Sequence, residues 1–249
     1  MQSKVFGHRG FSGKYPENTM LAFRKAIEAG ADGVELDVQL TKDGVPVIIH
    51  DEAVSRTCQE APGLVSDYTL QELQRLDASY LYHDAVGPQQ IPTLREYFDF
   101  MREAPHLVNI ELKTGKNPYP GIEEKTWALI QEYGLEDRVI ISSFNHYSIR
   151  RMQALAPQLK YGVLVEAWIY RPVDYCRAMN VQCYHPMYQN LTEEISRDLR
   201  QAGIEMNPYT VNDEAAVRTL AKRGITCIIG NFPDMTRRVL TEMAAAGEI

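Results

Sequence analysis

The stretch GVELDVQLTKDGVPVIIH, residues 33–50, contains two apolar runs separated by a short TKDG segment. The first run, Gly33–Val38, is typical of a buried strand in a parallel sheet. The second run, Val45–Ile49, follows an Asp-Gly pair, which indicates a hairpin turn between strands. Folding the chain back at this turn brings His50 level with Asp37 on the neighbouring strand. We therefore expect the second strand of the fold to be joined to a hairpin that brings His50 next to acidic residues.

An alternation of strand and helix patterns extends outward from this stretch. The predicted strands are Lys4–His8, Gly33–Val38, Leu107–Leu112, Arg138–Ser143, Lys160–Val165, Val181–His185, Ile204–Val211 and Ile225–Gly230. The predicted helices are Asn18–Ala29, Thr93–Arg102, Ile122–Tyr133, Tyr147–Leu155, Val173–Met179, Thr192–Ala202, Asp213–Lys222 and Met235–Ala245. Helix N-caps are expected at Asn18 and Thr93, and helix stops at Gly30, Gly134, Gly203 and Gly224. Eight βα units predict an α/β fold, a parallel sheet closed into a (β/α)8 TIM barrel.

Residues 51–90 interrupt this alternation. They have no strong period and contain Pro62, Gly63, Gly87 and Pro88, which are typical of turns and loops. We interpret the segment as a small insertion over one end of the barrel, placed after the second strand and its hairpin. The chain, residues 1–249, is accordingly predicted to form a single domain.

The overall composition excludes several classes of function. Hydrophobic residues make up 45% of the chain, and no stretch approaches the ~18 consecutive apolar residues of a membrane span, so we expect no stable membrane association. A net charge of −7 and the absence of long Lys/Arg blocks disfavour nucleic-acid binding. The four cysteines form no C-x-x-C pair, which disfavours disulfides and zinc. Met1–Lys4 leaves no room for a signal peptide, so the predicted location is cytoplasmic. The oligomeric state is left open.

Ionisable residues gather at the carboxyl ends of the predicted strands, where the active sites of (β/α)8 enzymes lie. Glu35 and Asp37 are two apart on one strand, so their side chains point to the same side, and Glu111 lies near the end of the next barrel strand. Three converging carboxylates suit a hard divalent cation such as Mg²⁺ or Ca²⁺. The alternative is a set of ion pairs, Glu35 with Arg9 and Glu111 with Lys113.

Two of the six histidines lead directly to this acidic cluster. His8 ends the first strand, and His50 ends the hairpin. Histidine titrates close to neutrality, so two of them beside a metal-held phosphate can share the roles of general base and general acid. The other histidines are interpreted mostly as capped or core residues: His83, His106, His146 and His185.

Arg9 and Lys113 are the cations expected nearest to this cluster. Arg9 offers a planar fork of donors and Lys113 a point charge, so both are candidates for binding an anionic substrate. Their alternative role is to neutralise the carboxylates when no metal is bound. The glycines around His8 lack the spacing of nucleotide-binding loops, which disfavours a nucleotide site.

An ordered series of motifs resembles the glycerophosphodiester phosphodiesterase family over nearly the whole chain. The motifs are His8-Arg9-Gly10, Pro16-Glu17-Asn18-Thr19, Gly33-Val34-Glu35-Leu36-Asp37-Val38, Thr41-Lys42-Asp43-Gly44-Val45-Pro46-Val47, Ile49-His50-Asp51, Ile91-Pro92-Thr93-Leu94 and Ile110-Glu111-Leu112-Lys113. Ser142-Ser143-Phe144 and Thr210-Val211-Asn212 extend the likeness into the second half. The resemblance implies a (β/α)8 barrel that hydrolyses small-molecule glycerophosphodiesters to sn-glycerol 3-phosphate and an alcohol, in glycerophospholipid catabolism.

The resemblance also implies roles for individual residues. It implies a Mg²⁺ or Ca²⁺ ion held by Glu35, Asp37 and Glu111, catalysis by His8 and His50, and substrate contacts from Arg9 and Lys113. It further implies that Glu17 and Asn18 shape the loop below the phosphate. Which histidine is the base is left open. The first nucleophile, water or the glycerol 2-hydroxyl, is also left open.

Two departures from the family pattern lie late in the chain. Tyr209 stands where the family often has Trp, and the sequence GNFP at 230–233 replaces the common Thr-Asp-aromatic-Pro. We expect neither departure to touch the metal ligands or the histidines. The part of the pocket that recognises the alcohol is therefore where this chain is expected to differ from its family.

Alternative functions are kept beside this one. The nearest are a lysophospholipase D and a phospholipase C-like phosphodiesterase, and the former needs an apolar groove for an acyl chain. A different class is a non-catalytic phosphate-ligand binding protein, which is disfavoured because both histidines and all three carboxylates are present. A metal-dependent amidohydrolase would want a His-x-His pair on the first strand, where this chain has His8-Arg9-Gly10.

Overall fold

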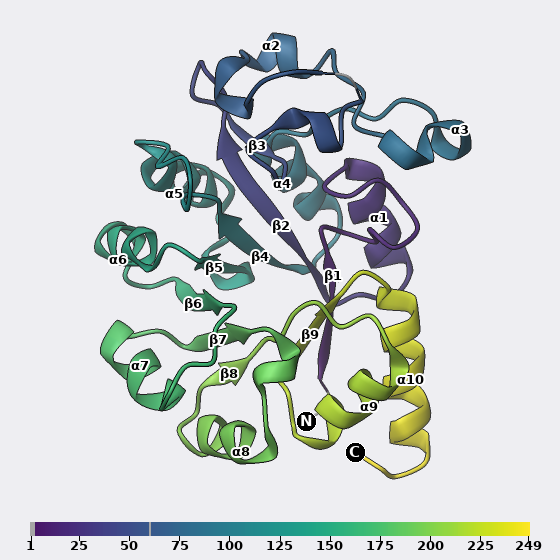
Figure 1. Cartoon of the computed structure of the whole chain (residues 1–249), viewed down its shortest axis with the longest axis vertical. Helices are drawn as coiled ribbons and strands as arrows, with labels where there is room; N and C mark the ends of the chain where they lie inside the picture. The colour runs from purple at the N-terminus through teal and green to yellow at the C-terminus, as the bar shows by residue number, and fades with distance from the viewer. Residues whose placement is uncertain (1–2, 60) are drawn as a thin grey trace.

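The structure is a computed structural model that describes residues 3–59 and 61–249. Its sheet has the strand order β8-β7-β6-β5-β4-β2-β1-β9, and every pair of neighbours in this order is parallel. The strands are β1 (Lys4–His8), β2 (Gly33–Leu40), β4 (Leu107–Leu112), β5 (Val139–Ser143), β6 (Lys160–Val165), β7 (Cys183–Pro186), β8 (Glu205–Met206) and β9 (Cys227–Gly230). Figure 1 shows them wound into a barrel, so the predicted (β/α)8 fold is confirmed.

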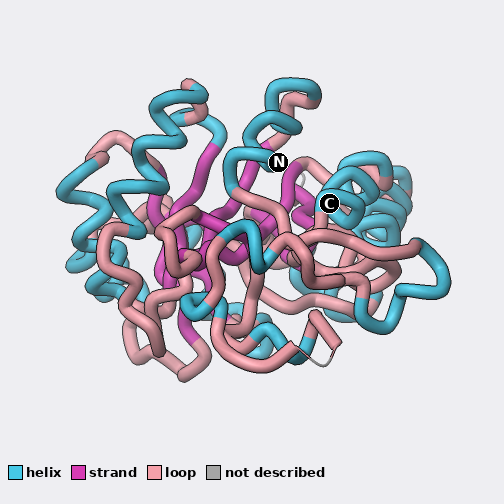
Figure 2. Tube along the Cα trace, turned by 90° about the horizontal axis from the view of Figure 1, so that it is seen from above, coloured by secondary structure: helices cyan, strands magenta, loops and turns pink. Residues whose placement is uncertain are grey.

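Helices surround the strands, as Figure 2 shows. They are α1 (Met20–Glu28), α4 (Leu94–Glu103), α5 (Ile122–Tyr133), α6 (His146–Leu155), α7 (Pro172–Met179), α8 (Glu193–Gln201), α9 (Glu214–Lys222) and α10 (Pro233–Ala245). The strands are buried on both faces, one against the helices and one inside the barrel, which explains their nearly continuous apolar sequences. Among the described residues, no helix is both long and apolar enough to span a membrane.

The last predicted strand pair closes the barrel less regularly than expected. The prediction of a strand over Ile204–Val211 is wrong in length, because the paired region is only Glu205–Met206. Pro208 has no backbone N–H and cannot continue a regular ladder. Closure onto the β9 side is made instead by separate hydrogen bonds, from Thr226 N to the Met206 carbonyl (3.1 Å) and from Ile229 N to the Pro208 carbonyl (3.1 Å).

The helix N-caps correct one prediction and confirm another. Thr93 caps α4 and forms a capping box with Glu96, as expected. Asn18, however, is not the cap of α1: Thr19 is, and its hydroxyl accepts a hydrogen bond from the Ala22 amide (3.2 Å). The Asn18 amide instead donates to Asp37 Oδ2 at 2.8 Å. Asn18, a residue type common at helix N-caps, therefore holds the carboxylate of Asp37 in the acidic cluster. The four predicted glycine stops all have positive φ: Gly30, Gly134, Gly203 and Gly224.

The hairpin forms as the sequence predicts. The short strand β3 (Pro46–Ile48) pairs antiparallel with β2, and the register sets Val38 opposite Ile48. The amide of Ile49 donates to the Asp37 carbonyl (3.0 Å), which brings the following residue, His50, back beside the acidic end of β2. The hairpin therefore gives a structural reason for a histidine so far along the chain to reach the carboxylates.

The insertion is less irregular than its sequence suggests. It contains the short helices η1 (Val54–Arg56), η2 (Val65–Asp67), α2 (Leu70–Leu73), η3 (Tyr80–Tyr82) and α3 (His83–Val86). Its buried side chains form a small core of their own with two residues of the hairpin, Val47 and Ile49. Figure 1 places this segment, with α2 and α3, beside β3 at one margin of the barrel. The predicted single-domain organisation stays a prediction, as does any role of the insertion over the barrel mouth. Residue 60 of the insertion lies outside the described residues. So do residues 1–2, which belong to the N-terminal stretch used for the prediction about a signal peptide.

A buried histidine that directly precedes β4, His106, makes the free energy of unfolding depend on pH. His106 is 5% exposed, and its Nε2 lies 2.9 Å from the Tyr97 hydroxyl, which donates to it when the ring is neutral. Burial, helped by Arg138, lowers the pKa of His106 to about 4. In the unfolded chain His106 becomes protonated below pH ~6.5, whereas in the folded chain it stays neutral down to about pH 4. The free energy of unfolding should therefore fall through this window, by up to about 3 kcal/mol from this residue.

Urea unfolding of wild type and His106→Gln between pH 7 and pH 4 tests this expectation. The variant should lose less stability on acidification than the wild type does. Gln131→Ala is the control, because Gln131 is exposed on α5 and does not ionise, so its substitution should leave the pH slope unchanged. Equal pH slopes in wild type and His106→Gln would contradict the assignment.

Candidate metal and acid–base site

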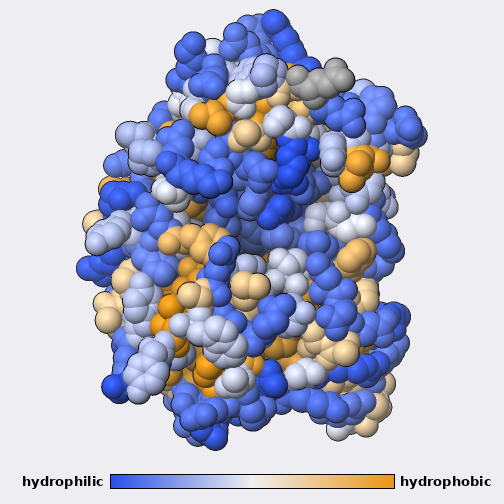
Figure 3. Space-filling model, in the orientation of Figure 1, coloured by the Kyte–Doolittle hydropathy of each residue, from blue (hydrophilic) through white to orange (hydrophobic). Residues whose placement is uncertain are grey.

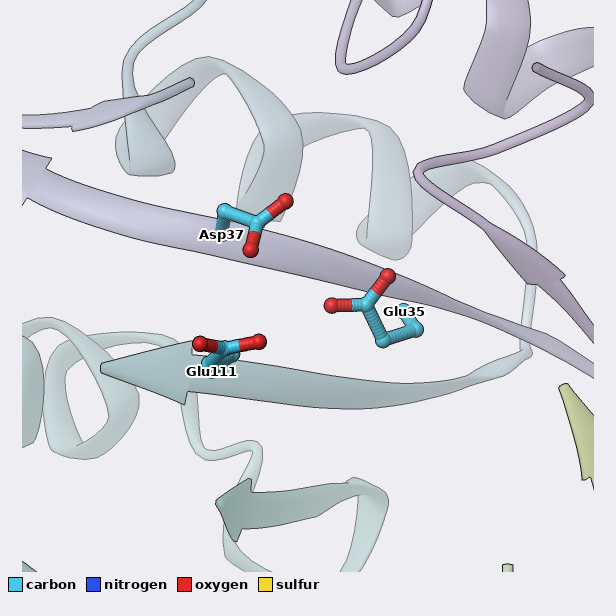
Figure 4. A group of neighbouring side chains, drawn as sticks. All are labelled: Glu35, Asp37 and Glu111. Atoms are coloured by element: carbon cyan, nitrogen blue, oxygen red, sulfur yellow. The ribbon is translucent and has the colours of Figure 1, made fainter. Parts of the chain in front are cut away.

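Three carboxylates meet at the carboxyl ends of β2 and β4. Glu35 and Asp37 project from the same face of β2, and the register places Glu111 of β4 directly beside Asp37. One oxygen from each of the three residues lies within 4.8 Å of the others, and all three residues are buried. Figure 4 shows the carboxylates of Glu35, Asp37 and Glu111 pointing toward one another. The structure thus brings together the three residues that the sequence suggested as metal ligands.

The electrostatics of this cluster are unfavourable without a cation. Burial raises the pKa of Glu35 well above its usual range, and the neighbouring Asp37 and Glu111 raise it further. Burial and Asp37 likewise raise the pKa of Glu111 to about 7. Burial also acts on Asp37, but Arg9, His50 and Lys113 hold its pKa well below the usual range. Two of the three carboxylates therefore resist ionisation.

The cluster fits a hard divalent cation. Asp37 Oδ1 is buried without a hydrogen-bond partner among the residues that the structure describes, which leaves a lone pair free to coordinate. Oxygen donors alone, from three carboxylates, are the ligands that Mg²⁺ and Ca²⁺ prefer. A bound cation would also relieve the mutual repulsion of Glu35 and Glu111. This fit rests on the donor set and does not distinguish the two metals.

Arg9 lies against the acidic cluster but not as the simple ion pair with Glu35. Its main-chain amide donates to Glu35 Oε2 at 3.0 Å. Its guanidinium donates to Glu17 Oε1 (3.0 Å) and lies 3.4 Å from Asp37 Oδ2. The guanidinium Nε is buried without a hydrogen-bond partner within the described part of the chain. The Arg9 guanidinium therefore lies between Glu17 and Asp37, at the wall of the cavity that Arg9 lines.

Lys113 does form the ion pair suggested as its alternative role. Its Nζ lies 2.9 Å from Glu111 Oε1 and 3.8 Å from Asp37 Oδ1. The same Nζ lies 3.2 Å from His50 Nε2. Since the ammonium group can only donate, this contact requires that Nε2 carries the lone pair and that Nδ1 carries the proton. Lys113 therefore links one histidine to two of the carboxylates.

His8 stands on the other side of the cluster, held by a residue that the sequence reasoning had set aside. Its Nε2 lies 3.9 Å from Glu35 Oε2, and its Nδ1 lies 2.7 Å from Asn231 Oδ1. The expectation that the departure at Asn231 would not touch the histidines is thus wrong. The Asn231 carbonyl oxygen accepts the Nδ1 proton, which leaves Nε2 free to face the cavity. Burial, followed by Arg9, lowers the pKa of His8 to about 4.

His50 is oriented by a chain of charges that reaches the insertion. Its Nδ1 lies 2.5 Å from Asp51 Oδ1, and Asp51 in turn accepts from Arg56. Arg56 also donates hydrogen bonds to Glu17 (2.7 and 2.9 Å), which accepts a hydrogen bond from Arg9 as well. Burial acts to raise the pKa of Asp51, but Arg56 and His50 lower it to about 2, so Asp51 stays charged and fixes the ring. Sequence reasoning missed Arg56, which stands in a segment without a period.

Five of these residues, His8, Arg9, Glu35, His50 and Glu111, line one cavity of about 260 Å³. Its lining residues are His8, Arg9, Glu35, His50, Asn109, Glu111, Phe144, Leu164, Glu166, Tyr209, Thr210 and Ile229. A second hollow of about 190 Å³ shares three of them and adds Lys113. Figure 3 shows hydrophilic residues gathered in a hollow near the centre of this face. The arrangement places two histidines and two cations around a carboxylate cluster, which suits proton transfer at a bound anion.

Comparison with known proteins finds a match to one family. The model of the glycerophosphoryl diester phosphodiesterase family matches residues 8–235. A glycerophosphodiester phosphodiesterase of Caldanaerobacter subterraneus is 44% identical over 234 residues, which cover 94% of this chain and 96% of the relative.

Solved structures agree in fold. A phosphodiesterase of Oleispira antarctica, in complex with the product sn-glycerol-3-phosphate, has a TM-score of 0.86 at 29% identity and covers 96% of this chain and 97% of its own. A protein from Silicibacter pomeroyi has a TM-score of 0.89 at 24% identity, with 97% and 94% covered, which supports the fold alone.

Proposed function

The chain belongs to the glycerophosphoryl diester phosphodiesterase family, and from this premise we propose that it hydrolyses glycerophosphodiesters to sn-glycerol 3-phosphate and an alcohol, with a divalent cation and in glycerophospholipid catabolism. The observation that supports this function most directly is the convergence of Glu35, Asp37 and Glu111 at the wall of one cavity, which Glu35 and Glu111 line together with His8 and His50. A phosphodiester is a substrate that needs both parts, since its negative charge must be neutralised, the attacking nucleophile must lose a proton and the leaving alcohol oxygen must gain one.

In the proposed site, Glu35, Asp37 and Glu111 would hold Mg²⁺ or Ca²⁺, which would supply positive charge for the phosphate. Arg9 and Lys113 bind phosphate oxygens from the protein side. These two cations stabilise the charge that develops as the nucleophile enters and the alcohol leaves in line.

The two histidines divide the proton transfers in this proposal. One deprotonates the nucleophile, either water or first the glycerol 2-hydroxyl, and the other protonates the leaving alcohol oxygen. Asp51 and Asn231 accept the Nδ1 protons, which leaves the lone pair of each ring on Nε2, and Lys113 donates to the Nε2 of His50 at 3.2 Å. The anionic phosphate raises the pKa of the histidine beside it, which prepares that ring to act as the acid.

A metal-by-metal assay tests the function. The protein is depleted of metal, then given Mg²⁺, Ca²⁺ or no metal with glycerophosphocholine, glycerophosphoethanolamine or glycerophosphoglycerol, and glycerol 3-phosphate is measured. We expect release only with added metal. Binding without release at saturating metal would favour the non-catalytic phosphate-binding alternative.

Lysophosphatidylcholine in the same assay tests the lysophospholipase D alternative. A cavity of about 260 Å³ suits a small alcohol and offers little room for an acyl chain. We therefore expect much slower release from the lysophospholipid than from glycerophosphocholine. Comparable rates would contradict this preference.

A further inference from the structure

The cavity wall has two chemically different halves. The half built by β1, β2, β4 and the hairpin carries the carboxylate cluster, both histidines and Arg9. The other half is contributed by the ends of β5, β6 and the segment after β8, and it presents Phe144, Leu164, Glu166 and Tyr209. The metal, histidines and cations account for the first half only. The second half contains one carboxylate, Glu166, which the proposed reaction does not use.

The Glu166 carboxylate has no counter-charge of its own. Its residue is exposed directly after β6, and the side chain forms no ion pair or hydrogen bond with any residue in the described ranges. Its position is nevertheless fixed, because its main-chain carbonyl accepts a hydrogen bond from Asn190 Nδ2 at 2.8 Å. An unpaired carboxylate on an ordered strand end at the cavity wall is available to a positively charged ligand group.

Aromatic rings stand beside this carboxylate. Phe144 and Tyr209 pack edge to face, with ring centroids 6.0 Å apart and planes at 88°. The Tyr209 hydroxyl donates to the Val165 carbonyl at 3.1 Å, one residue before Glu166, which holds the ring in place. Burial raises the pKa of Tyr209, and both Glu166 and Glu111 raise it further, so this ring lies within the field of both carboxylates.

We propose that Glu166, with the rings of Tyr209 and Phe144, forms a subsite for a cationic alcohol group of the substrate, an amino or quaternary ammonium alcohol. This assignment rests on the proposed function, because it presumes that a phosphodiester occupies the cavity. A carboxylate and aromatic faces are the groups that attract an ammonium ion. Leu164 and Ile229 complete a partly apolar wall that suits the methylene or methyl groups such a cation carries.

The polarity of the whole cavity supports this substrate class. Arg9 lies at the half that is proposed to hold the phosphate, and Lys113 borders both halves, with its Nζ 2.9 Å from Glu111 and 6.0 Å from the centroid of the Phe144 ring. Glu166 lies at the other half, beside Tyr209. A diester of a cationic alcohol has its negative charge at the phosphate and its positive charge at the alcohol, so both charges meet opposite partners. A neutral alkyl alcohol would cover Glu166 without neutralising it, which is unfavourable.

Paired substrates that differ only in charge test the subsite. We would measure kcat/KM for glycerophosphocholine and for the 3,3-dimethylbutyl ester of glycerol phosphate, in which an uncharged carbon replaces the ammonium nitrogen. Wild type should prefer the choline ester about fivefold, the size expected for a partly exposed charge pair with aromatic contacts. Glu166→Gln should abolish this preference by lowering only the choline ester's value, and Glu166→Lys should reverse it.

Glu194→Gln is the matched control. Glu194 lies in the first turn of α8, at the same end of the barrel, is exposed and forms no ion pair within the described residues, so its substitution removes one charge outside the cavity. This variant should keep the wild-type preference. Raising the ionic strength should weaken the preference in wild type and leave Glu166→Gln unchanged, which a purely structural role of Glu166 would not do.

The outcomes separate this inference from the function on which it rests. Hydrolysis of both esters with the same ratio in wild type and Glu166→Gln would overturn the subsite and leave the phosphodiesterase function standing. Failure of metal-loaded wild type to hydrolyse either ester or glycerophosphoglycerol would overturn the function and the subsite together. If Glu194→Gln lost the preference for the choline ester to the same extent, the subsite would also be overturned, because the preference would then depend on the net charge of the protein and not on Glu166.

Discussion

Replacing His8 or His50 by alanine should in each case lower kcat at least ~10²-fold, because each imidazole is proposed to perform one of the two proton transfers. Both rings line the same cavity, on different sides of the carboxylates, so neither can substitute for the other. Burial lowers the pKa of both rings, which makes both neutral near pH 7 before substrate binds. The measurement is the initial rate of glycerol 3-phosphate release from glycerophosphocholine at saturating metal and substrate.

The control for these variants is His83→Ala. His83 is exposed on α3 and pairs with Asp77 outside the cavity, so its loss should leave kcat near the wild-type value. Unchanged melting temperatures would show that the variants fold. Near-normal turnover in both His8→Ala and His50→Ala would contradict the acid–base assignment.

A change of leaving group assigns the two roles. The p-nitrophenyl ester of glycerol phosphate expels an anion that needs no protonation, so the variant that lacks the acid should recover much of its rate on this substrate. The variant that lacks the base should not recover, because its nucleophile still has to lose a proton. Equal recovery in His8→Ala and His50→Ala would contradict a division of the two roles between these rings.

The fold could be predicted because its elements are set by local patterns. β1, β4 and β6 begin and end at the predicted residues, since burial on both faces makes their sequences short apolar runs. The Asp-Gly turn fixed the hairpin register, and with it the approach of His50. The convergence of the carboxylates followed from a strand period of two together with parallel neighbours. Each of these inferences needed only residues within one element and its turn, or within two neighbouring parallel strands.

The parts that sequence reasoning missed depend on contacts between distant segments. Asn231 meets His8 across 223 positions, because β9 and β1 are neighbours only once the barrel closes. Arg56 comes from the insertion, where no periodicity indicates which side chain faces the barrel. Asn18 has a residue type that suits helix capping, and only the structure shows that Asp37 takes its amide. Residue type and spacing do not determine such side-chain partners.

Binding of a divalent cation to Glu35, Asp37 and Glu111 should change both the stability and the activity of the protein. In metal-free wild type, addition of Mg²⁺ or Ca²⁺ at ~100 times its dissociation constant should stabilise the fold by about 2.7 kcal/mol, which raises the melting temperature by roughly 5–10 °C. Asp37→Asn should abolish this rise and lower kcat more than ~10²-fold, since it removes a ligand at the centre of the cluster. Calorimetry or thermal denaturation with and without metal measures the shift.

The metal-free proteins should differ in a way that only this electrostatic account explains. Glu35→Gln should melt higher than wild type without metal, because the Glu35 carboxylate is buried beside two others and its raised pKa makes ionisation costly. Asp37→Asn should melt lower, because Asp37 loses its attraction to Arg9 and Lys113. Both variants should lose the metal response, whereas Asp84→Asn on exposed α3 should keep it. If metal still raised the melting temperature of Glu35→Gln and Asp37→Asn, the cation would bind elsewhere. If both metal-free variants melted equally far below the wild type, the proposed repulsion between the carboxylates would be contradicted.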